Sequence, residues 1–264
     1  MAPALAAQSA GARGGSTRLG DLFADEGVDL SLDLGCGYGV GALGVAEMAS
    51  VAPLNVLGCD INRAGTAFGA GVASRWGVGQ RCAFLADDAS VLLRRLQRGE
   101  YDGRVTRAVV SCPTPFAVSL GGATFPRAAA SSLDYFATPP FFDAVADTLG
   151  TGSTLHLAAN VEDVALAMCD SAMATRRFAP LVLPPSGSPP RYHAPPEAAM
   201  GAATPTACAR SPRRQQAWRR ESGRRASGPA WRVGQLCLPE ARSETELAYA
   251  LEGRQTYRVV LERL

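Results

Sequence analysis

Short apolar runs alternate with segments of helical periodicity along the first part of the chain. The runs have the length of buried strands, and each of the first three is followed by apolar residues at helical spacing. Strands that alternate with helices are typical of a parallel sheet covered on both faces. We therefore predict an α/β fold with strands at about 29–34, 54–60, 81–86 and 105–111 and helices at about 40–48, 64–76 and 90–98.

The first predicted strand ends near Asp33 and leads into a turn with glycine at alternate positions, Gly35, Gly37 and Gly39. Glycine has no Cβ, so backbone N–H groups and the start of the next helix can approach a ligand closely. The spacing differs from the Gly-x-Gly-x-x-Gly of dinucleotide sites, and Asp33 suits an ammonium group better than a phosphate. The turn indicates a cofactor site, with a tight turn that binds nothing as the alternative.

Acids also follow the second and third predicted strands. Asp60, next to Ile61, ends the second strand and can accept both hydroxyls of a ribose, and Asp88 and Ala89 follow the third strand. The carboxyl ends of parallel strands meet at one edge of a sheet, so we expect these residues to line the same site as the glycine turn. Taken alone, Asp60 also fits a solvated acid at a strand end.

The segment Asp-Leu-Gly-Cys-Gly-Tyr-Gly at 33–39 resembles the first motif of the class I S-adenosylmethionine-dependent methyltransferases. The resemblance implies a Rossmann-like, seven-stranded, mostly parallel sheet with an antiparallel last strand, and S-adenosyl-L-methionine as cofactor. In that family the glycine turn packs against the aminoacyl part of the cofactor, and an acid followed by a small residue, here Asp88-Ala89, holds the adenine amino group. The loop after the fourth strand faces the methyl group, which adds Cys112 to the expected cofactor site.

The order of motifs also resembles the transfer RNA guanine-N7 methyltransferases. Cys-Pro-Thr-Pro-Phe at 112–116 is similar to that family's Phe-Pro-Asp-Pro-Trp loop, and the segment from Ala159, which includes Asn160, is similar to its Thr-Asp-x-x-x-Tyr. Ser-Glu-Thr-Glu at 243–246 resembles its Thr-x-x-Glu. The resemblance implies methylation of guanine N7 in tRNA, with Glu246 accepting the guanine N1–H and amino group and with Thr114 and Asn160 orienting the base.

Guanine N7 carries a lone pair and no proton at neutral pH, so its methylation depends on positioning and needs no general base. The chain has only two histidines, neither of them within these motifs, which agrees with such chemistry. Two alternatives stay open. One is a methyltransferase for another RNA base or a small molecule, and the other is a catalytically silent RNA-binding protein that keeps the fold.

Positive charge is concentrated in one segment of the chain. All 26 basic residues are arginines, and 11 of them lie within 176–232 beside two acids, whereas the rest of the chain is net negative. A basic segment on an acidic domain suggests a polyanion partner, here tRNA. Within this segment, arginines lie on both sides of Trp218 in the sequence, and RNA-binding arms have the same mixture of arginine and aromatic residues. A solvated basic linker is the alternative.

Composition divides the 264 residues into a tail, a domain and an insertion. Residues 1–18, rich in Ala, Gly and Ser, are predicted to be disordered. The methyltransferase domain is predicted at 19–178 and 235–264, and 179–234, rich in Pro, Ala and Arg, is predicted to be a mostly disordered insertion.

Cysteine, histidine and hydrophobic patterns exclude several classes of protein. Seven scattered cysteines without a C-x-x-C pair indicate neither a disulfide framework nor a zinc site, and two histidines argue against a histidine-based metal site. No apolar run reaches the ~18 residues of a membrane span. We expect an intracellular protein of the cytoplasm or nucleus. The acid-free, arginine-containing N-terminus leaves an organelle open, and a protein partner subunit is also left open.

Overall fold

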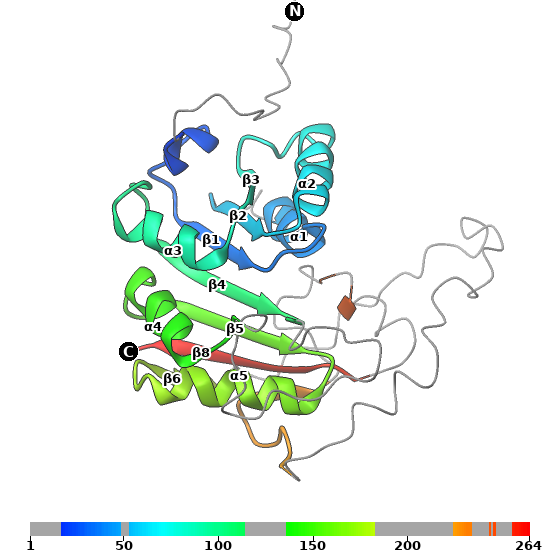
Figure 1. The fold of residues 1–264 in the computed structure, drawn as a ribbon, viewed down its shortest axis with the longest axis vertical. Coiled ribbons are helices and arrows are strands. Elements are labelled where there is room, and N and C mark those ends of the chain that lie inside the picture. The colour runs from blue at the N-terminus through cyan, green and yellow to red at the C-terminus, as the bar shows by residue number, and fades with distance from the viewer. Residues whose placement is uncertain are drawn as a thin grey trace, which may run out of the picture.

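A mixed sheet forms the centre of the computed structural model (Figure 1). The structure describes residues 17–48, 53–113, 136–182, 224–233, 243, 245–246 and 255–264. Its strands are β1 (Leu30–Leu34), β2 (Asn55–Asp60), β3 (Cys82–Ala86), β4 (Val105–Ser111), β5 (Thr154–Ala159), β6 (Phe178–Pro180), β7 (Trp231–Val233) and β8 (Tyr257–Arg263). Its helices are the 3-10 helix η1 (Leu19–Leu22), α1 (Val40–Met48), α2 (Arg63–Arg75), α3 (Ala89–Gln97), α4 (Pro139–Thr148) and α5 (Glu162–Ala174).

The strand order is β3-β2-β1-β4-β5-β8-β6, and β7 also pairs with β8. Strands β1 to β5 are parallel to one another, whereas β8 lies antiparallel to β5. The predicted fold is confirmed in that the sheet is mostly parallel and its last strand is antiparallel. The described residues form eight strands and not the predicted seven, because β6 and β7 both pair with β8 on the same side. The order reverses at β1, which pairs with β2 on one side and with β4 on the other. In open α/β sheets, ligands bind outside the carboxyl ends of the strands at such a reversal.

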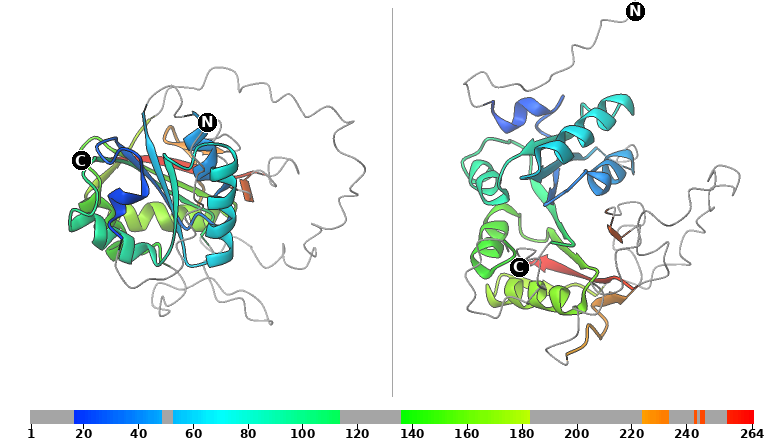
Figure 2. Two further views of the ribbon diagram at one scale, coloured as in Figure 1. Left: turned by 90° about the horizontal axis from the view of Figure 1, so that it is seen from above. Right: turned by 45° about the vertical axis from the view of Figure 1, so that its right-hand side comes forward.

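Helices cover both faces of the sheet (Figures 1 and 2). Residues of α1 and α2 pack with Val56 and Cys82 in one apolar cluster, and residues of α3, α4 and α5 pack with Leu32 and Leu34 in a larger one. Side chains alternate between the faces of a sheet, so Asp33 projects toward the α1 side. None of the described helices has the length and apolar character needed to cross a membrane.

Strands β6 and β7 share one edge position of the sheet. β6 pairs with residues 261–263 of β8, and the Leu181 N–H continues the ladder to the Val260 carbonyl at 2.9 Å. β7 then begins with Trp231 opposite Val259. Both short strands run antiparallel to β8, so the chain leaves the edge after Leu181 and rejoins it at the next position along β8.

This pairing corrects the ends of the predicted insertion. Residues 179–180 and 231–233 of the range 179–234 belong to the sheet. Strands of three residues show no periodic pattern, so the sequence did not indicate them. The central part of the insertion, residues 183–223, and most of the predicted tail, residues 1–16, lie outside the described residues.

The last part of the insertion is held on α5. Arg224 forms an ion pair with Asp170, and the Ala226 N–H donates to Oε1 of buried Glu162 at 2.7 Å. Arg225 lies 3.5 Å from the other oxygen of Glu162. Because Glu162 is the first residue of α5, these contacts place the end of the insertion at the carboxyl edge of β5.

Candidate active site

The glycine turn between β1 and α1 is attached to the end of β2. The N–H groups of Gly35 and Cys36 both donate to the Cys59 carbonyl, at 2.8 and 3.1 Å. Gly35, Gly37 and Gly39 have φ values of +82°, +57° and +78°, a region in which residues with a Cβ are strained. The backbone of the turn therefore requires the alternate glycines seen in the sequence.

Neighbouring elements pack against this turn without space for side chains. A Cβ on Gly39 would lie 2.2 Å from the ring of Phe84 in β3, and a Cβ on Gly65 in α2 would lie 2.4 Å from the Gly37 carbonyl oxygen. Both distances are far shorter than van der Waals contact. Elements β3 and α2 thus hold the turn in one conformation from two sides.

Asp60, at the end of β2, is joined to the glycine turn. Its Oδ2 accepts the N–H of Gly37 at 2.8 Å, and its Oδ1 accepts the N–H of Asn62 at 2.8 Å. Each carboxylate oxygen can accept a second hydrogen bond, so capacity for the hydroxyls of a ribose is left. The next residue, Ile61, is 77% exposed. The structure thus brings Gly37, Asp60 and Ile61 together, and their role toward a cofactor stays a prediction.

Asp88 has a local role that the sequence analysis did not include. It is the N-cap of α3, where its Oδ1 accepts the N–H of Ser90 at 2.7 Å, and Ala89 is the first residue of the helix. An acid directly before an apolar-periodic segment is a helix start signal, so this cap could have been predicted. The Cys59 thiol donates to the Asp87 carbonyl at 3.2 Å, which places this loop beside the end of β2.

Asp33 connects the glycine turn to a segment far along the chain. It lies at the carboxyl end of β1 and is buried, with 8% exposed. A Cβ on Gly41 in α1 would lie 3.1 Å from its Oδ2 and 3.9 Å from the backbone nitrogen of Ser243. The start of α1 therefore lies between Asp33, a predicted cofactor residue, and the segment of Glu246, a predicted substrate residue.

Glu246 forms a capping box and a buried ion pair. The Ser243 N–H donates to Glu246 Oε2 at 3.1 Å, and the Glu246 N–H donates to Ser243 Oγ at 3.3 Å, the reciprocal pattern of Ser-x-x-Glu at a helix start. Glu246 Oε1 accepts a hydrogen bond from Arg258 Nε at 2.7 Å, and both side chains are 4% exposed. The Ser-x-x-Glu signature of these residues could have predicted the cap, whereas no pattern in the sequence indicates the partner in β8.

Cys112 and Asn160 lie beside this pair, just after β4 and β5. The Cys112 N–H donates to a carbonyl of β5 at 2.8 Å, and its φ is +50°. Burial, and then the Glu246 carboxylate, raise the pKa of the Cys112 thiol to about 12, against the effect of hydrogen bonds with Asn160 and Ser243. The thiol is therefore protonated at neutral pH and is a poor nucleophile. The third predicted substrate residue, Thr114, lies outside the described residues.

His156 of β5 is neutral in the folded protein. Burial, and then the charge of Arg107, lower its pKa to about 3. Its Nε2 lies 3.0 Å from Thr154 Oγ1, and its Nδ1 has no hydrogen-bond partner in the described part of the chain. A histidine with so low a pKa is a poor general base near neutral pH.

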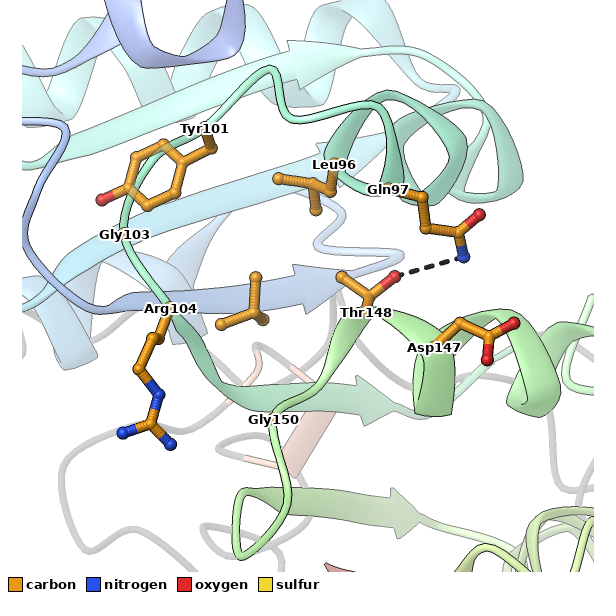
Figure 3. A pocket seen from close by; sticks show the side chains of 9 residues that line it. Leu96, Gln97, Tyr101, Gly103, Arg104, Asp147, Thr148 and Gly150 are labelled. Atoms are coloured by element: carbon orange, nitrogen blue, oxygen red, sulfur yellow. Dashed lines mark hydrogen bonds between the residues drawn. The ribbon is translucent and has the colours of Figure 1, made fainter.

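A pocket of about 310 Å³ lies at the other end of the sheet (Figure 3). Val105 begins β4 and Gly150 precedes β5, so the pocket lies at the amino ends of these strands, whereas Asp33, Cys112 and Asn160 lie at carboxyl ends. It contains none of the predicted site residues. The residues that line it are Leu96, Gln97, Tyr101, Gly103, Arg104, Val105, Asp147, Thr148 and Gly150.

No family model matches the chain, and no curated protein matches it. The O-methyltransferase from the trans-AT PKS multienzyme of Brevibacillus brevis, in complex with S-adenosyl-L-homocysteine, is 18% identical over 50% of this chain and 35% of its own, with a TM-score of 0.33. TrmN from Thermus thermophilus is 16% identical over 90% of this chain and 44% of its own, with a TM-score of 0.44. The 16S rRNA methyltransferase KamB is 15% identical over 58% of this chain and 73% of its own, with a TM-score of 0.38. The chain spans well under two thirds of the first two structures, and at these identities the likeness concerns the fold alone.

Proposed function

We propose that this protein transfers a methyl group from S-adenosyl-L-methionine to N7 of guanine in transfer RNA. The observation that carries the proposal is the hydrogen bond from Gly37 N–H to Asp60 Oδ2, at 2.8 Å. It joins a glycine turn with positive φ angles to an acid at the end of the next strand, beside the point where the sheet order reverses. A ribonucleoside cofactor needs both of these features at one place.

The residues present fit the parts of this cofactor. Asp60 accepts the ribose hydroxyls, and buried Asp33 suits the ammonium group of the aminoacyl part, beside the glycine turn. S-adenosyl-L-methionine, when bound, supplies a methyl group on a positively charged sulfur. The residues proposed to hold it are Asp33, Gly35, Gly37, Gly39, Asp60, Ile61, Asp88, Ala89 and Cys112.

The proposed acceptor agrees with the chemistry at the carboxyl edge. Attack by guanine N7 releases no proton, so the site has only to orient the base and the cofactor. The Cys112 thiol, with a pKa of about 12, and His156 of β5, with a pKa of about 3, are unsuited to general base catalysis at neutral pH, and the Glu246 carboxylate is already paired with Arg258. We assign orientation of the base to Thr114, Asn160 and the pair of Glu246 with Arg258, and binding of tRNA to the arginines of 176–232.

Turnover tests the proposal directly. The protein is incubated with labelled S-adenosyl-L-methionine and bulk tRNA, and the tRNA is then digested to nucleosides. Label in 7-methylguanosine alone supports the proposal. Label in another nucleoside points to a different base, and tRNA binding without any label points to a catalytically silent RNA-binding protein.

Calorimetry tests the cofactor site separately. Asp60→Ala should weaken the binding of S-adenosyl-L-homocysteine by about 10-fold or more, because a carboxylate that accepts two hydroxyls is lost. Asp143→Ala is a matched control, since Asp143 is an exposed acid of α4. Equal affinity in both variants would remove Asp60 from the site, and no heat with the unsubstituted protein would refute the cofactor proposal.

A further inference from the structure

Arg258 carries a buried hydrogen-bond donor that no described residue accepts. The residue is 3% exposed, and its Nε donates to Glu246 Oε1 at 2.7 Å. Its Nη1 is buried without a hydrogen-bond partner among the described residues. Leaving a charged donor buried and unpaired is costly, so native proteins rarely keep one without a use. A guanidinium nitrogen without an acceptor at this place points to a ligand that accepts its hydrogen bond.

Strand pairing places Arg258 at the carboxyl edge of the sheet. Arg258 lies opposite Ala158 of β5, and Ala158 lies opposite Ser111 of β4. Cys112 directly follows Ser111, and Asn160 follows Ala158 by two residues. Arg258 is therefore level with the ends of β4 and β5, where the acceptor of the methyl group is expected.

Strand pairing also gives the face from which Arg258 projects. Asp33 lies opposite Val109, Val109 opposite His156, and His156 opposite Val260. Side chains two positions apart on a strand share a face, so Arg258 projects from the same face as Asp33. This is the face on which the start of α1 lies between Asp33 and the segment of Glu246.

The neighbours of Arg258 on this face differ on its two sides. Toward β1 the row contains Ser111 and Ala158, two short side chains. On the outer side Arg232 of β7 lies opposite Arg258, and its Nη1 donates to the Pro229 carbonyl at 2.8 Å. A flat ring that meets Arg258 from this side would lie level with Ser111 and Ala158.

Charge decides which ligand atom suits the free nitrogen. Glu246 already balances Arg258, so a second buried anion would leave negative charge uncompensated, whereas a neutral carbonyl oxygen would not. We propose that Arg258 Nη1 donates a hydrogen bond to a carbonyl oxygen of the methyl acceptor. This inference rests on the proposed function: for guanine the oxygen is O6, next to N7, where adenine has an amino group instead. Arg258 would then determine the preference for guanine over adenine.

A single-atom change in the substrate tests this contact. The guanosine identified by nucleoside analysis is replaced in a synthetic tRNA by 6-thioguanosine, which keeps N1–H and the amino group but has the weak acceptor sulfur in place of O6. With the unsubstituted protein, kcat/KM should fall by about 10-fold, because a hydrogen bond from a charged donor is weakened.

The same comparison is made with Arg258→Met/Glu246→Gln. This double variant removes both buried charges together, and glutamine keeps the capping box. The difference between the two tRNAs should shrink to within about 2-fold, while circular dichroism and the affinity for S-adenosyl-L-homocysteine stay unchanged. If the variant turns over too slowly, the ratio of Kd values for the two tRNAs gives the same comparison.

The possible results separate the two proposals. An equal penalty for sulfur in both proteins, or no penalty in the unsubstituted protein, would overturn the role of Arg258 and leave guanine methylation standing. Failure of the unsubstituted protein to methylate any guanosine would overturn both, and it is recognised by the absence of turnover on the unmodified tRNA.

Discussion

Replacing Glu246 with alanine should destabilise the whole domain before it affects any substrate. The substitution removes the carboxylate that accepts Arg258 Nε at 2.7 Å and the Ser243 N–H at 3.1 Å. Arg258 then keeps its charge at 3% exposure with no described partner for Nε or Nη1. Loss of activity in Glu246→Ala would therefore say nothing by itself about recognition of a base.

The expected size follows from the two contacts. Removing one partner of a buried ion pair costs about 3–5 kcal/mol, and loss of a capping interaction costs about 1 kcal/mol. The sum of about 4–6 kcal/mol is a large part of the 5–15 kcal/mol typical of a folded domain. Glu246→Gln, which keeps the cap, should lose about 1 kcal/mol less than Glu246→Ala.

Urea unfolding of four proteins measures the coupling. Glu246→Ala, Arg258→Met, the Glu246→Ala/Arg258→Met double variant and the unsubstituted chain form a double-mutant cycle. Because the double variant leaves no unpaired charge, it should be more stable than either single variant, with a coupling free energy of about 3 kcal/mol. A loss below about 1 kcal/mol in Glu246→Ala, or additive losses in the double variant, would refute the buried pair.

Three further predictions test the turn, the insertion and the buried histidine. Gly39→Ala should lower the free energy of unfolding, measured by thermal unfolding, by about 2 kcal/mol or more beyond the effect of Gly99→Ala. Both glycines have a φ of +78°, but only at Gly39 would the new Cβ clash with a ring, that of Phe84. Equal losses would contradict the packing. Deletion of residues 182–230, with the flanking residues joined, should leave a folded protein with a melting temperature within about 5 °C, because a shorter loop costs less entropy to close and this offsets the missing ion pairs with α5. The pKa of His156 is about 3 when folded and ordinary when unfolded, so the unfolded state takes up a proton first as pH falls below about 6.5. The free energy of unfolding, measured in urea, should therefore fall by about 2 kcal/mol more in the unsubstituted protein than in His156→Gln between pH 7 and pH 5. A difference between the two proteins that stays constant with pH would contradict the burial of His156.

The central part of the fold could be predicted because burial leaves a strong pattern. Strands β1 and β2 are covered on both faces, so they are nearly continuous apolar runs, and the predicted limits of β4 agree with the observed Val105–Ser111. Strands β6 and β7 have three residues each and exist because β8 offers them an edge. Their sequence has no strand signal of its own, so composition assigned their residues to the insertion.

The site divides in the same way. The glycine turn, Asp60 and Asp88 each follow a predicted strand, so the geometry of a parallel sheet places them at one edge. The pair of Glu246 with Arg258 joins two segments whose spacing in the sequence does not reveal their contact. In β8, Arg258 looks like an ordinary polar residue of an alternating strand, and only the pairing with Ala158 shows that it lies near the carboxyl end of β5, two residues before the level of Asn160.

The edge strand separates the sheet from the insertion. The Leu181 N–H reaches Val260, and Trp231 lies opposite Val259, so the two flanks occupy successive places along β8 and the sheet is complete without residues 182–230. The returning end is nevertheless fixed to Glu162 at the start of α5, two residues after Asn160. An RNA held by the arginines of this insertion would therefore be held near the carboxyl edge where the methyl acceptor is expected. If the folded deletion variant binds tRNA with unchanged affinity, the RNA-binding surface lies at the sheet edge. If its tRNA affinity falls steeply while its cofactor affinity is unchanged, the insertion binds the RNA.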